Sequence, residues 1–184
     1  MSITKRLGAV AAALAMVVSM AVVSASPASA EPLGGDISVV GCADIANQGW
    51  QVDGVNMATY SYRAGFRSEW EIVTSVAVSR PESRWCTGAS TKVLHPDRIE
   101  DSRGLMQINV TVSEGNWAYI KPICGLTTPE TLWDPQANYN CAFKLYLHNG
   151  RSFGAWSAYR SGSYVAAKPM AKAGYDLARA WGRF

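Results

Sequence analysis

The fold is decided by one segment, residues 68–84, which reads Ser68-Glu69-Trp70-Glu71-Ile72-Val73-Thr74-Ser75-Val76-Ala77-Val78-Ser79-Arg80-Pro81-Glu82-Ser83-Arg84. This segment predicts a helix, because Ser68 can cap the first turn and Glu71 can complete a capping box three residues later. Apolar side chains recur at helical spacing between Val73 and Ala77, so one face of the helix is expected to be buried.

The end of this helix carries the first candidate for chemistry. Pro81 brings no N–H and crowds the residue before it, so it is expected to end or kink the helix. Glu82 follows directly. A carboxylate at the end of a buried helix loses solvent, which raises its pKa and lets it hold a proton near neutral pH. Glu82 is therefore a candidate acid catalyst, and a solvated glutamate at a helix end is the alternative.

Residues 1–30 have the pattern of a secretory signal peptide. Lys5 and Arg6 form a positive start, Leu7 to Val23 is apolar, and Ala28-Ser29-Ala30 is an A-x-A cleavage site. The alternative is that this segment stays uncleaved and anchors the protein in a membrane. No other apolar run in the sequence approaches membrane-spanning length. We expect a secreted protein with no membrane attachment after cleavage.

The chain that remains, residues 31–184, has the length of one domain with one hydrophobic core. Lys5 and Arg6 account for two of the positive charges behind the formal net charge of +3. No basic tract is present, and the two histidines, His95 and His148, are scattered. We therefore expect no nucleic-acid partner, and a monomer.

The four cysteines of the chain all follow residue 30, and an even number in a secreted protein predicts two disulfides. Three connectivities are open; we favour Cys42–Cys86 and Cys124–Cys141 because each pair brackets one local segment. No C-x-x-C spacing or histidine cluster accompanies them, so neither a metal site nor a cofactor is expected.

The rest of the chain predicts a mainly α domain, α+β at most, over residues 53–184, preceded by an extended lead-in over residues 31–52. Further helices are expected from about Gly54 to Ala64, from Pro135 to about Asn149, and from about Pro169 to Trp181. A short helical turn should start at Pro129.

A polar segment from Cys86 to Arg103 shows no periodicity and carries three acids, Asp97, Glu100 and Asp101. A loop of this length in a compact domain is usually functional or disordered. The apolar run that follows it is interrupted by Gln107 and Asn109.

Four groups of residues, in this order, resemble the lysozyme-like domain of the soluble lytic transglycosylase and goose-type lysozyme superfamily, and most of all its versions in actinobacterial secreted proteins and phage lysins. They are Tyr60-Ser61-Tyr62-Arg63-Ala64-Gly65-Phe66-Arg67 leading into the helix that ends in Glu82-Ser83, then Gly104-Leu105-Met106-Gln107-Ile108-Asn109, Leu132-Trp133-Asp134-Pro135-Gln136-Ala137-Asn138, and Trp156-Ser157-Ala158-Tyr159-Arg160-Ser161-Gly162. The likeness covers roughly residues 54–181 and implies a lysozyme-like helical domain with an active-site groove.

The resemblance implies a secreted enzyme that cuts the β-1,4 bond between N-acetylmuramic acid and N-acetylglucosamine in peptidoglycan. It implies that Glu82 is the general acid and that Ser83 contacts the substrate or the glutamate. Gln107, with the backbone around Met106 and Ile108, matches a wall of the sugar-binding groove. Tyr159 matches a tyrosine whose hydroxyl lies near the catalytic carboxylate.

The second half of the reaction is left open by the sequence. In a transglycosylase the substrate's own N-acetyl and 6-hydroxyl groups complete the reaction and give an anhydro product. In a hydrolase a second carboxylate activates water, and Asp101, then Asp97 and Glu100, are the candidates.

Three departures from the family pattern motivate an alternative function, a wall-binding or interaction protein that keeps the fold without useful turnover. Arg80-Pro81 precedes the acid where a small or aliphatic residue is usual. Arg84-Trp85 follows it where glycine is common, and Trp85 either stacks on a sugar or covers the core. Tyr159-Arg160 replaces the usual Tyr-Asn and exchanges a groove amide for a cation.

Overall fold

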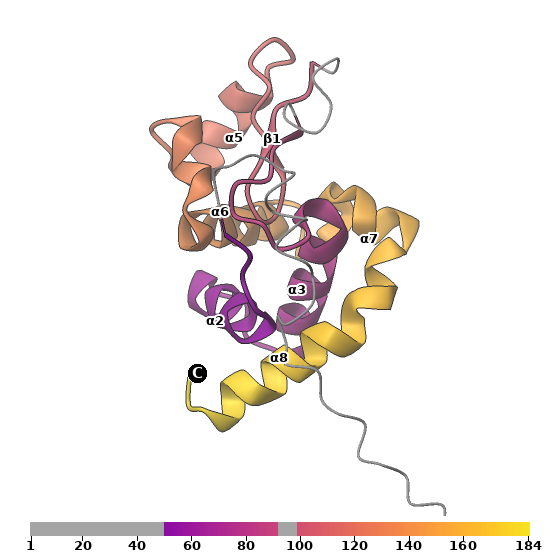
Figure 1. Ribbon diagram of the computed structural model, residues 1–184. Coiled ribbons are helices and arrows are strands. Elements are labelled where there is room, and N and C mark those ends of the chain that lie inside the picture. The colour runs from indigo at the N-terminus through magenta and orange to yellow at the C-terminus, as the bar shows by residue number, and fades with distance from the viewer. Residues whose placement is uncertain (1–49, 92–98) are drawn as a thin grey trace, which may run out of the picture.

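Helix α3 (Glu69–Ser83) lies at the centre of the molecule, with the other helices packed around it (Figure 1). The computed structural model describes residues 50–91 and 99–184. The capping box forms as predicted: the Ser68 hydroxyl accepts from the Glu71 N–H at 3.1 Å, and the Glu71 carboxylate accepts from the Ser68 N–H at 3.0 Å. The sequence therefore fixes where this helix begins.

Burial of α3 extends around its whole circumference, which corrects the prediction of a single buried face. Every residue from Glu71 to Ser79 is buried. The two serine hydroxyls in this stretch are accommodated because they bond within the helix: Ser75 donates to the Ile72 carbonyl at 2.9 Å, and Ser79 to the Val76 carbonyl at 2.8 Å. Small polar side chains thus serve as core residues and let neighbouring helices approach closely.

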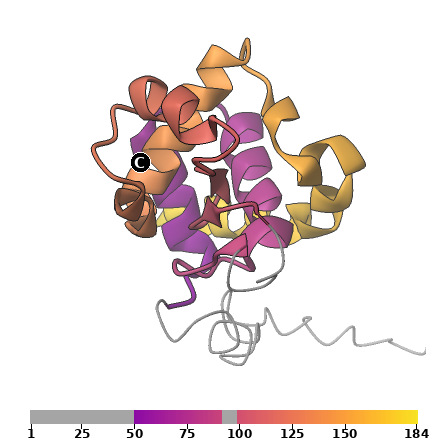
Figure 2. The same cartoon turned by 90° about the horizontal axis from the view of Figure 1, so that it is seen from above.

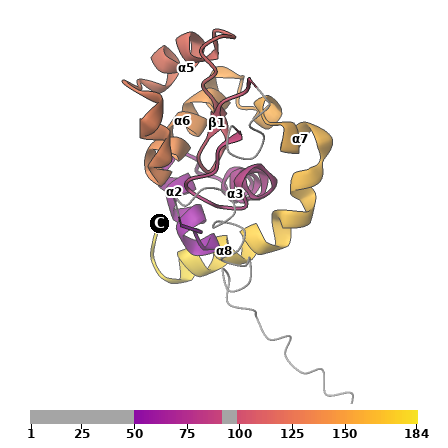
Figure 3. The ribbon, with the colours of Figure 1, turned by 45° about the horizontal axis from the view of Figure 1, so that its top comes forward.

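The ring around α3 is made by α2 (Gly54–Ala64), α7 (Ser157–Ser161), η3 (Ser163–Ala167) and α8 (Lys168–Ala180), all of which contact it. Seen from above, α3 stands inside these elements (Figures 2 and 3). Helices α2 and α8 cross where Gly54 meets Gly174, and a Cβ on Gly174 would lie 2.5 Å from the Gly54 carbonyl. Glycine is required at this crossing because the two backbones touch.

A second group of elements packs on α2 and extends above α3 in Figure 1. It consists of α6 (Pro135–His148), α5 (Asn116–Cys124) and the short turns η1 (Pro129–Trp133) and η2 (Phe153–Ala155). The predicted disulfide Cys124–Cys141 is confirmed and ties α5 to α6. Cys86 is also disulfide-bonded; its predicted partner, Cys42, lies outside the described residues.

The small β-structure is one antiparallel pair, β1 (Ser102–Arg103) and β2 (Ile108–Asn109), with Ser102 opposite Asn109. It closes the turn at residues 104–107. Residues 50–52 run beside the chain that follows α3: Gln51 bridges Cys86, and the Val52 N–H donates to the Trp85 carbonyl at 2.9 Å. The chain just after Glu82 is therefore held from outside the helix.

Most helix predictions are confirmed, the one that ended the helix at Pro81 is wrong, and helix α5 was not predicted. Helix α2 has the predicted bounds, and α6 and α8 begin and end within about one residue of expectation. Pro81 does not end α3, because so near the C-terminus it removes only one intrahelical bond, and the Arg84 N–H still reaches the Arg80 carbonyl at 2.8 Å. Helix α5 was missed because Gly115, the residue before its first turn, offers no side-chain cap, and because the helix contains Pro122. The predicted signal peptide and almost all of the predicted lead-in lie outside the described residues.

Glu71 joins the start of α3 to the chain that follows α6. Its carboxylate accepts from Nη2 of Arg151 at 2.7 Å and from the Tyr146 hydroxyl at 3.1 Å, in addition to the N–H groups of Arg67 and Ser68 at 3.0 Å. Burial by itself would raise the pKa of Glu71, but these four hydrogen bonds outweigh it and lower the pKa to about 2.

Replacing Glu71 should make the free energy of unfolding less dependent on pH between about 2 and 4.5. A folded-state pKa of about 2 against an ordinary 4.5 stabilises the fold above pH 4.5 by about 3 kcal/mol, and this is lost as the pH falls toward 2. Glu71→Gln should therefore lower the free energy of unfolding by roughly that amount at pH 7 and by little near pH 2. Urea unfolding at both pH values measures this. Glu69→Gln, exposed in the same turn, is the matched control, and an equal Glu71→Gln deficit at both pH values would contradict the prediction.

Candidate active site

Glu82 is held at the last turn of α3 by the start of α7. Its carboxylate oxygen Oε1 accepts from the Ala158 N–H at 3.0 Å and from the Ser157 hydroxyl at 3.2 Å. These donors lie about 75 residues further along the chain. The carboxylate therefore has a fixed position even though α3 carries Pro81 one residue earlier.

The surroundings of Glu82 favour its protonated form. Burial raises its pKa most strongly, and the nearby charge of Glu100 raises it further. The hydrogen bonds from Ala158 and Ser157 and the charge of Arg160 act in the opposite direction without cancelling the shift. A carboxyl with a raised pKa near a cavity can deliver a proton to a bound substrate.

A groove of about 700 Å³ contains this carboxyl. Three parts of the chain line it: the end of α3 with Pro81 and Glu82, the polar segment around β1 and β2, and the stretch from Ala155 to Arg160. Its lining is Pro81, Glu82, Thr91, Glu100, Ser102, Gln107, Asn109, Ala155, Trp156, Ser157 and Arg160. The volume is within the usual range for small-molecule sites, about 300–1,000 Å³.

A second pocket of about 240 Å³ continues the groove toward α5. It shares Gln107, Asn109, Ala155 and Trp156 with the first pocket, and adds the amide side chains of Asn116 and Asn149 and the half-exposed ring of Tyr119. A ligand longer than one ring could therefore run from Glu82 across the face of Gln107.

Gln107 forms the groove wall as the resemblance implied, but its amide is engaged in holding that wall together. Nε2 donates to the carbonyls of Ala89 at 2.8 Å and Gly104 at 2.9 Å, and Oε1 accepts from the Thr91 hydroxyl at 3.2 Å. These bonds support a left-handed backbone at Gln107 (φ 43°). Gln107 thus shapes the wall rather than offering a free amide to a ligand.

The peptide of Met106 is clamped from both sides. Its N–H donates to the Asn138 side chain at 2.8 Å, and its carbonyl accepts from the Trp156 indole at 2.8 Å. Asn138 is fully buried and also donates to the carbonyls of Arg103 and Leu132. Sequence reasoning missed Asn138, although an asparagine on the same face as Ala142 and Leu145 was a visible signal.

The turn at Gly104 depends on the same asparagine. Gly104 has a left-handed backbone (φ 72°), and a Cβ there would collide with the Asn138 side chain and the Leu132 carbonyl. Glycine is therefore required to bring residues 104–107 against α6.

Other residues matched by the resemblance do not hydrogen-bond to the Glu82 carboxyl, whose partners among the described residues are Ser157 and Ala158. Ser83 is buried, donates to the Ser79 carbonyl at 3.0 Å and accepts from the Trp85 N–H at 3.1 Å. Tyr159 stacks on Tyr164 and is not among the groove-lining residues. Ile108 is buried in β2 and lines only the second pocket.

The acidic segment is placed differently from the expectation. Asp101 is buried and binds the Arg103 guanidinium through both oxygens, each at 2.9 Å, and it does not line the groove. Glu100 does line it, with its carboxylate accepting from the Ser102 hydroxyl at 2.7 Å. Glu100 is therefore better placed as a second carboxylate than Asp101. Asp97 lies outside the described residues.

Within residues 50–91 and 99–184, no three His, Cys, Asp or Glu side chains gather as ligands of a metal ion would. In the same ranges no helix has the length and apolar character needed to cross a bilayer.

Residues 58–158 match the family described as "Lysozyme like domain", a span that runs from α2 through Glu82 and the groove wall to Ala158, which binds Glu82. The chain belongs to this family. A lysozyme-like domain suggests a glycan-cleaving role on peptidoglycan and implies binding of that substrate. No curated protein and no solved structure matches the chain.

This lysozyme-like domain turns sharply just after the acid. Arg84 and Trp85 both have left-handed backbones, with φ of 53° and 62°. Trp85 is fully buried and its indole donates to the Val76 carbonyl at 3.1 Å, so it is a core residue and not a sugar platform. Arg84 is exposed and terminates α3 in a conformation that glycine adopts more easily.

Arg84→Gly should stabilise the domain. Removing the Cβ relieves about 1–2 kcal/mol of left-handed strain, and the greater freedom of unfolded glycine offsets part of it, leaving about 0.5–1 kcal/mol. The thermal midpoint should rise by about 2 °C. The thermal midpoint of the Arg84→Ala variant should not rise, because alanine keeps the Cβ. A glycine variant that melts at or below wild type would contradict this account of the turn.

Proposed function

We propose that this protein cleaves the β-1,4 bond between N-acetylmuramic acid and N-acetylglucosamine in peptidoglycan, with Glu82 as the general acid. In this proposal the protein is secreted after removal of residues 1–30 and acts as a monomer on glycan strands. The observation that carries the proposal is a carboxyl with a raised pKa, fixed by Ser157 and Ala158, inside the groove of a lysozyme-like domain.

The environment of Glu82 fits the first half of glycoside cleavage. A protonated carboxyl gives its proton to the oxygen of the leaving sugar as the bond to the anomeric carbon breaks, and positive charge develops on the sugar that remains. The resulting carboxylate is then stabilised by the hydrogen bonds from Ala158 and Ser157 and by the charge of Arg160. The same contacts that oppose protonation in the free enzyme thus favour proton release during the reaction.

The second half has two routes in this groove. In the first, Glu100 takes a proton from water, whose oxygen attacks the anomeric carbon and leaves a reducing end. In the second, the 6-hydroxyl of the N-acetylmuramic acid attacks that carbon and passes its proton to the Glu82 carboxylate, which gives a 1,6-anhydro sugar. Among the described residues, Glu100 is the other carboxylate that lines the groove, and the two routes differ in whether it takes part.

Glu82→Gln should abolish clearing of purified cell walls, measured as loss of turbidity. General acid catalysis contributes roughly 10²–10⁴-fold, so the rate should fall by about that factor. The variant should melt no lower than wild type, because an amide avoids the cost of a desolvated charge and can still accept from Ala158. Glu114→Gln, on an exposed loop carboxylate, is the matched control. Equal clearing by Glu82→Gln and wild type would contradict the role of Glu82.

Glu100→Gln separates hydrolysis from transglycosylation, with mass spectrometry of the released muropeptides as the readout. With Glu100 as base, wild type should release reducing ends, and the variant should lose most of this activity. Release of anhydro sugars by both proteins at similar rates would contradict a role for Glu100 as base and assign the second half to the substrate.

A second candidate function is binding to cell-wall glycan without turnover. It is favoured by Arg160, whose charge lowers the pKa of Glu82 and so opposes the protonated acid. Failure of wild type to clear walls, together with its sedimentation with them, would support this function over cleavage.

A further inference from the structure

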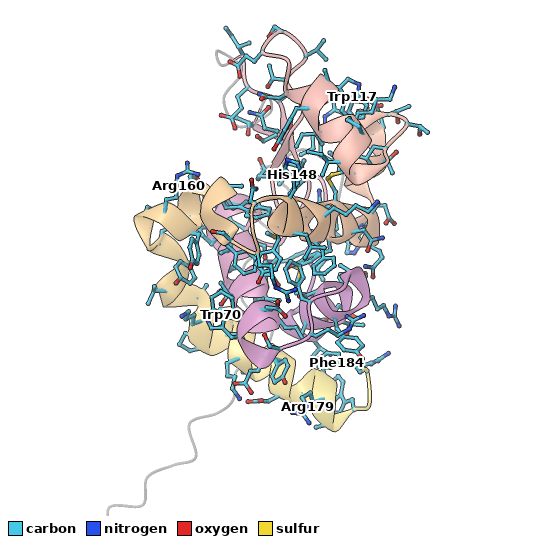
Figure 4. All side chains as sticks on the ribbon, turned by 180° about the vertical axis from the view of Figure 1, so that it is seen from behind. Trp70, Trp117, His148, Arg160, Arg179 and Phe184 are labelled. Atoms are coloured by element: carbon cyan, nitrogen blue, oxygen red, sulfur yellow. A yellow bond between two sulfur atoms is a disulfide. The ribbon has the colours of Figure 1, made fainter. Side chains whose placement is uncertain are left out.

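Arg160 lines the groove next to Glu82 and is fixed by one side of its guanidinium. Nη1 donates to the carbonyls of Gly154 at 2.8 Å and Ala155 at 2.9 Å, which end the short turn η2. The charge of Arg160 acts on the Glu82 carboxyl across the groove. In Figure 4, Arg160 projects from α7 at the outer edge of the molecule.

The other edge of this guanidinium is open. None of the described residues accepts a hydrogen bond from Nε or Nη2 of Arg160, and none forms an ion pair with it. Carboxylates typically bind to such an edge in a bidentate way. The Arg160 guanidinium is held in place through Nη1, and its Nε and Nη2 donors remain available to bind a carboxylate.

Arg103 shows the complete arrangement in the same protein. Its Nη1 donates to Glu130 at 3.0 Å, while Nε and Nη2 bind both oxygens of Asp101 at 2.9 Å. Arg160 has the same division, with Nη1 engaged and the Nε–Nη2 edge available, but no carboxylate within residues 50–91 and 99–184 binds that edge.

We propose that Arg160 recognises a carboxylate of the glycan strand and so selects muramic-acid-containing strands over neutral ones, an inference that rests on the proposed function. Two carboxylates have the required chemistry. One is the lactyl carboxylate of N-acetylmuramic acid that carries no peptide, and the other belongs to the peptide attached to that lactyl group.

Charge in the groove links this recognition to the acid. Glu82 and Glu100 would repel an anionic ligand, so a cation is needed for such a ligand to bind there at all. Once bound, the ligand's negative charge neutralises Arg160 and disfavours ionisation of Glu82. An anionic strand would therefore help to keep the proton on the catalytic carboxyl, whereas a neutral strand would not.

Binding measurements test this proposal independently of turnover. The probes are peptide-free oligosaccharides of alternating N-acetylglucosamine and N-acetylmuramic acid, the same oligosaccharides bearing peptide, and chitin oligosaccharides of equal length. Calorimetry is done on the Glu82→Gln protein so that no probe is consumed. We expect the carboxylate-bearing probes to bind about tenfold more tightly than chitin, a preference that weakens with salt.

Arg160→Gln on this background should reduce the preference to about one, while Arg160→Lys should retain part of it because the charge remains. Arg63→Gln, on an exposed arginine of α2, is the matched control and should leave the preference unchanged. A preference for the peptide-free probe assigns recognition to the lactyl carboxylate, and one confined to the peptide-bearing probe assigns it to the peptide.

The failures of the two proposals are distinguishable. Absence of wall clearing by wild type, with the Arg160-dependent preference intact, would contradict the proposed cleavage but support the recognition role. Unchanged preference in Arg160→Gln, or equal binding of all three probes by the parent protein, would overturn the role of Arg160. A purely structural role for Arg160 would lower binding of all probes equally and would also overturn it.

Discussion

The complete burial of α3 is the constraint on which the rest of the structure depends. A helix covered on every side cannot place a charge along its middle, so its ionisable groups lie at its ends. The hydroxyls of Ser75 and Ser79 donate hydrogen bonds to carbonyls of the same helix. They therefore need no other partner, and α2, α7 and α8 can surround the helix. The last turn is where α3 emerges from this cover, and Glu82 lies there.

The two glutamates at opposite ends of α3 show how environment sets chemistry. Both lose solvent, which raises the pKa of a carboxyl. Glu71 receives four hydrogen bonds, one from a cation, and its pKa falls to about 2. Glu82 receives two, faces the charge of Glu100, and keeps a raised pKa. The first carboxyl therefore contributes to stability, whereas the raised pKa of the second supports its proposed role as the acid.

The groove depends on polar contacts between segments far apart in the chain. Asn138 and Trp156 hold the Met106 peptide from α6 and from the start of α7, and Gln107 ties the turn to Ala89. Ser157 and Ala158, which follow Trp156 directly, bind the Glu82 carboxylate. One short stretch, residues 156–158, thus fixes the acid and the opposite wall together, so their separation is set by the fold and not by loop flexibility.

The sequence by itself determined most of the helices, the capping box and the candidate acid, and it favoured the Cys124–Cys141 disulfide, because caps, periodicity and spacing are local signals. Only the tertiary structure decided which polar residues face the groove. Asp101 and Glu100 are adjacent in sequence, yet Arg103 binds the first while the second lines the groove. Local patterns could mark Asn138 only as a polar residue on the buried face of its helix. Its contacts, like the open edge of Arg160, depend on carbonyls and charges brought from other parts of the chain.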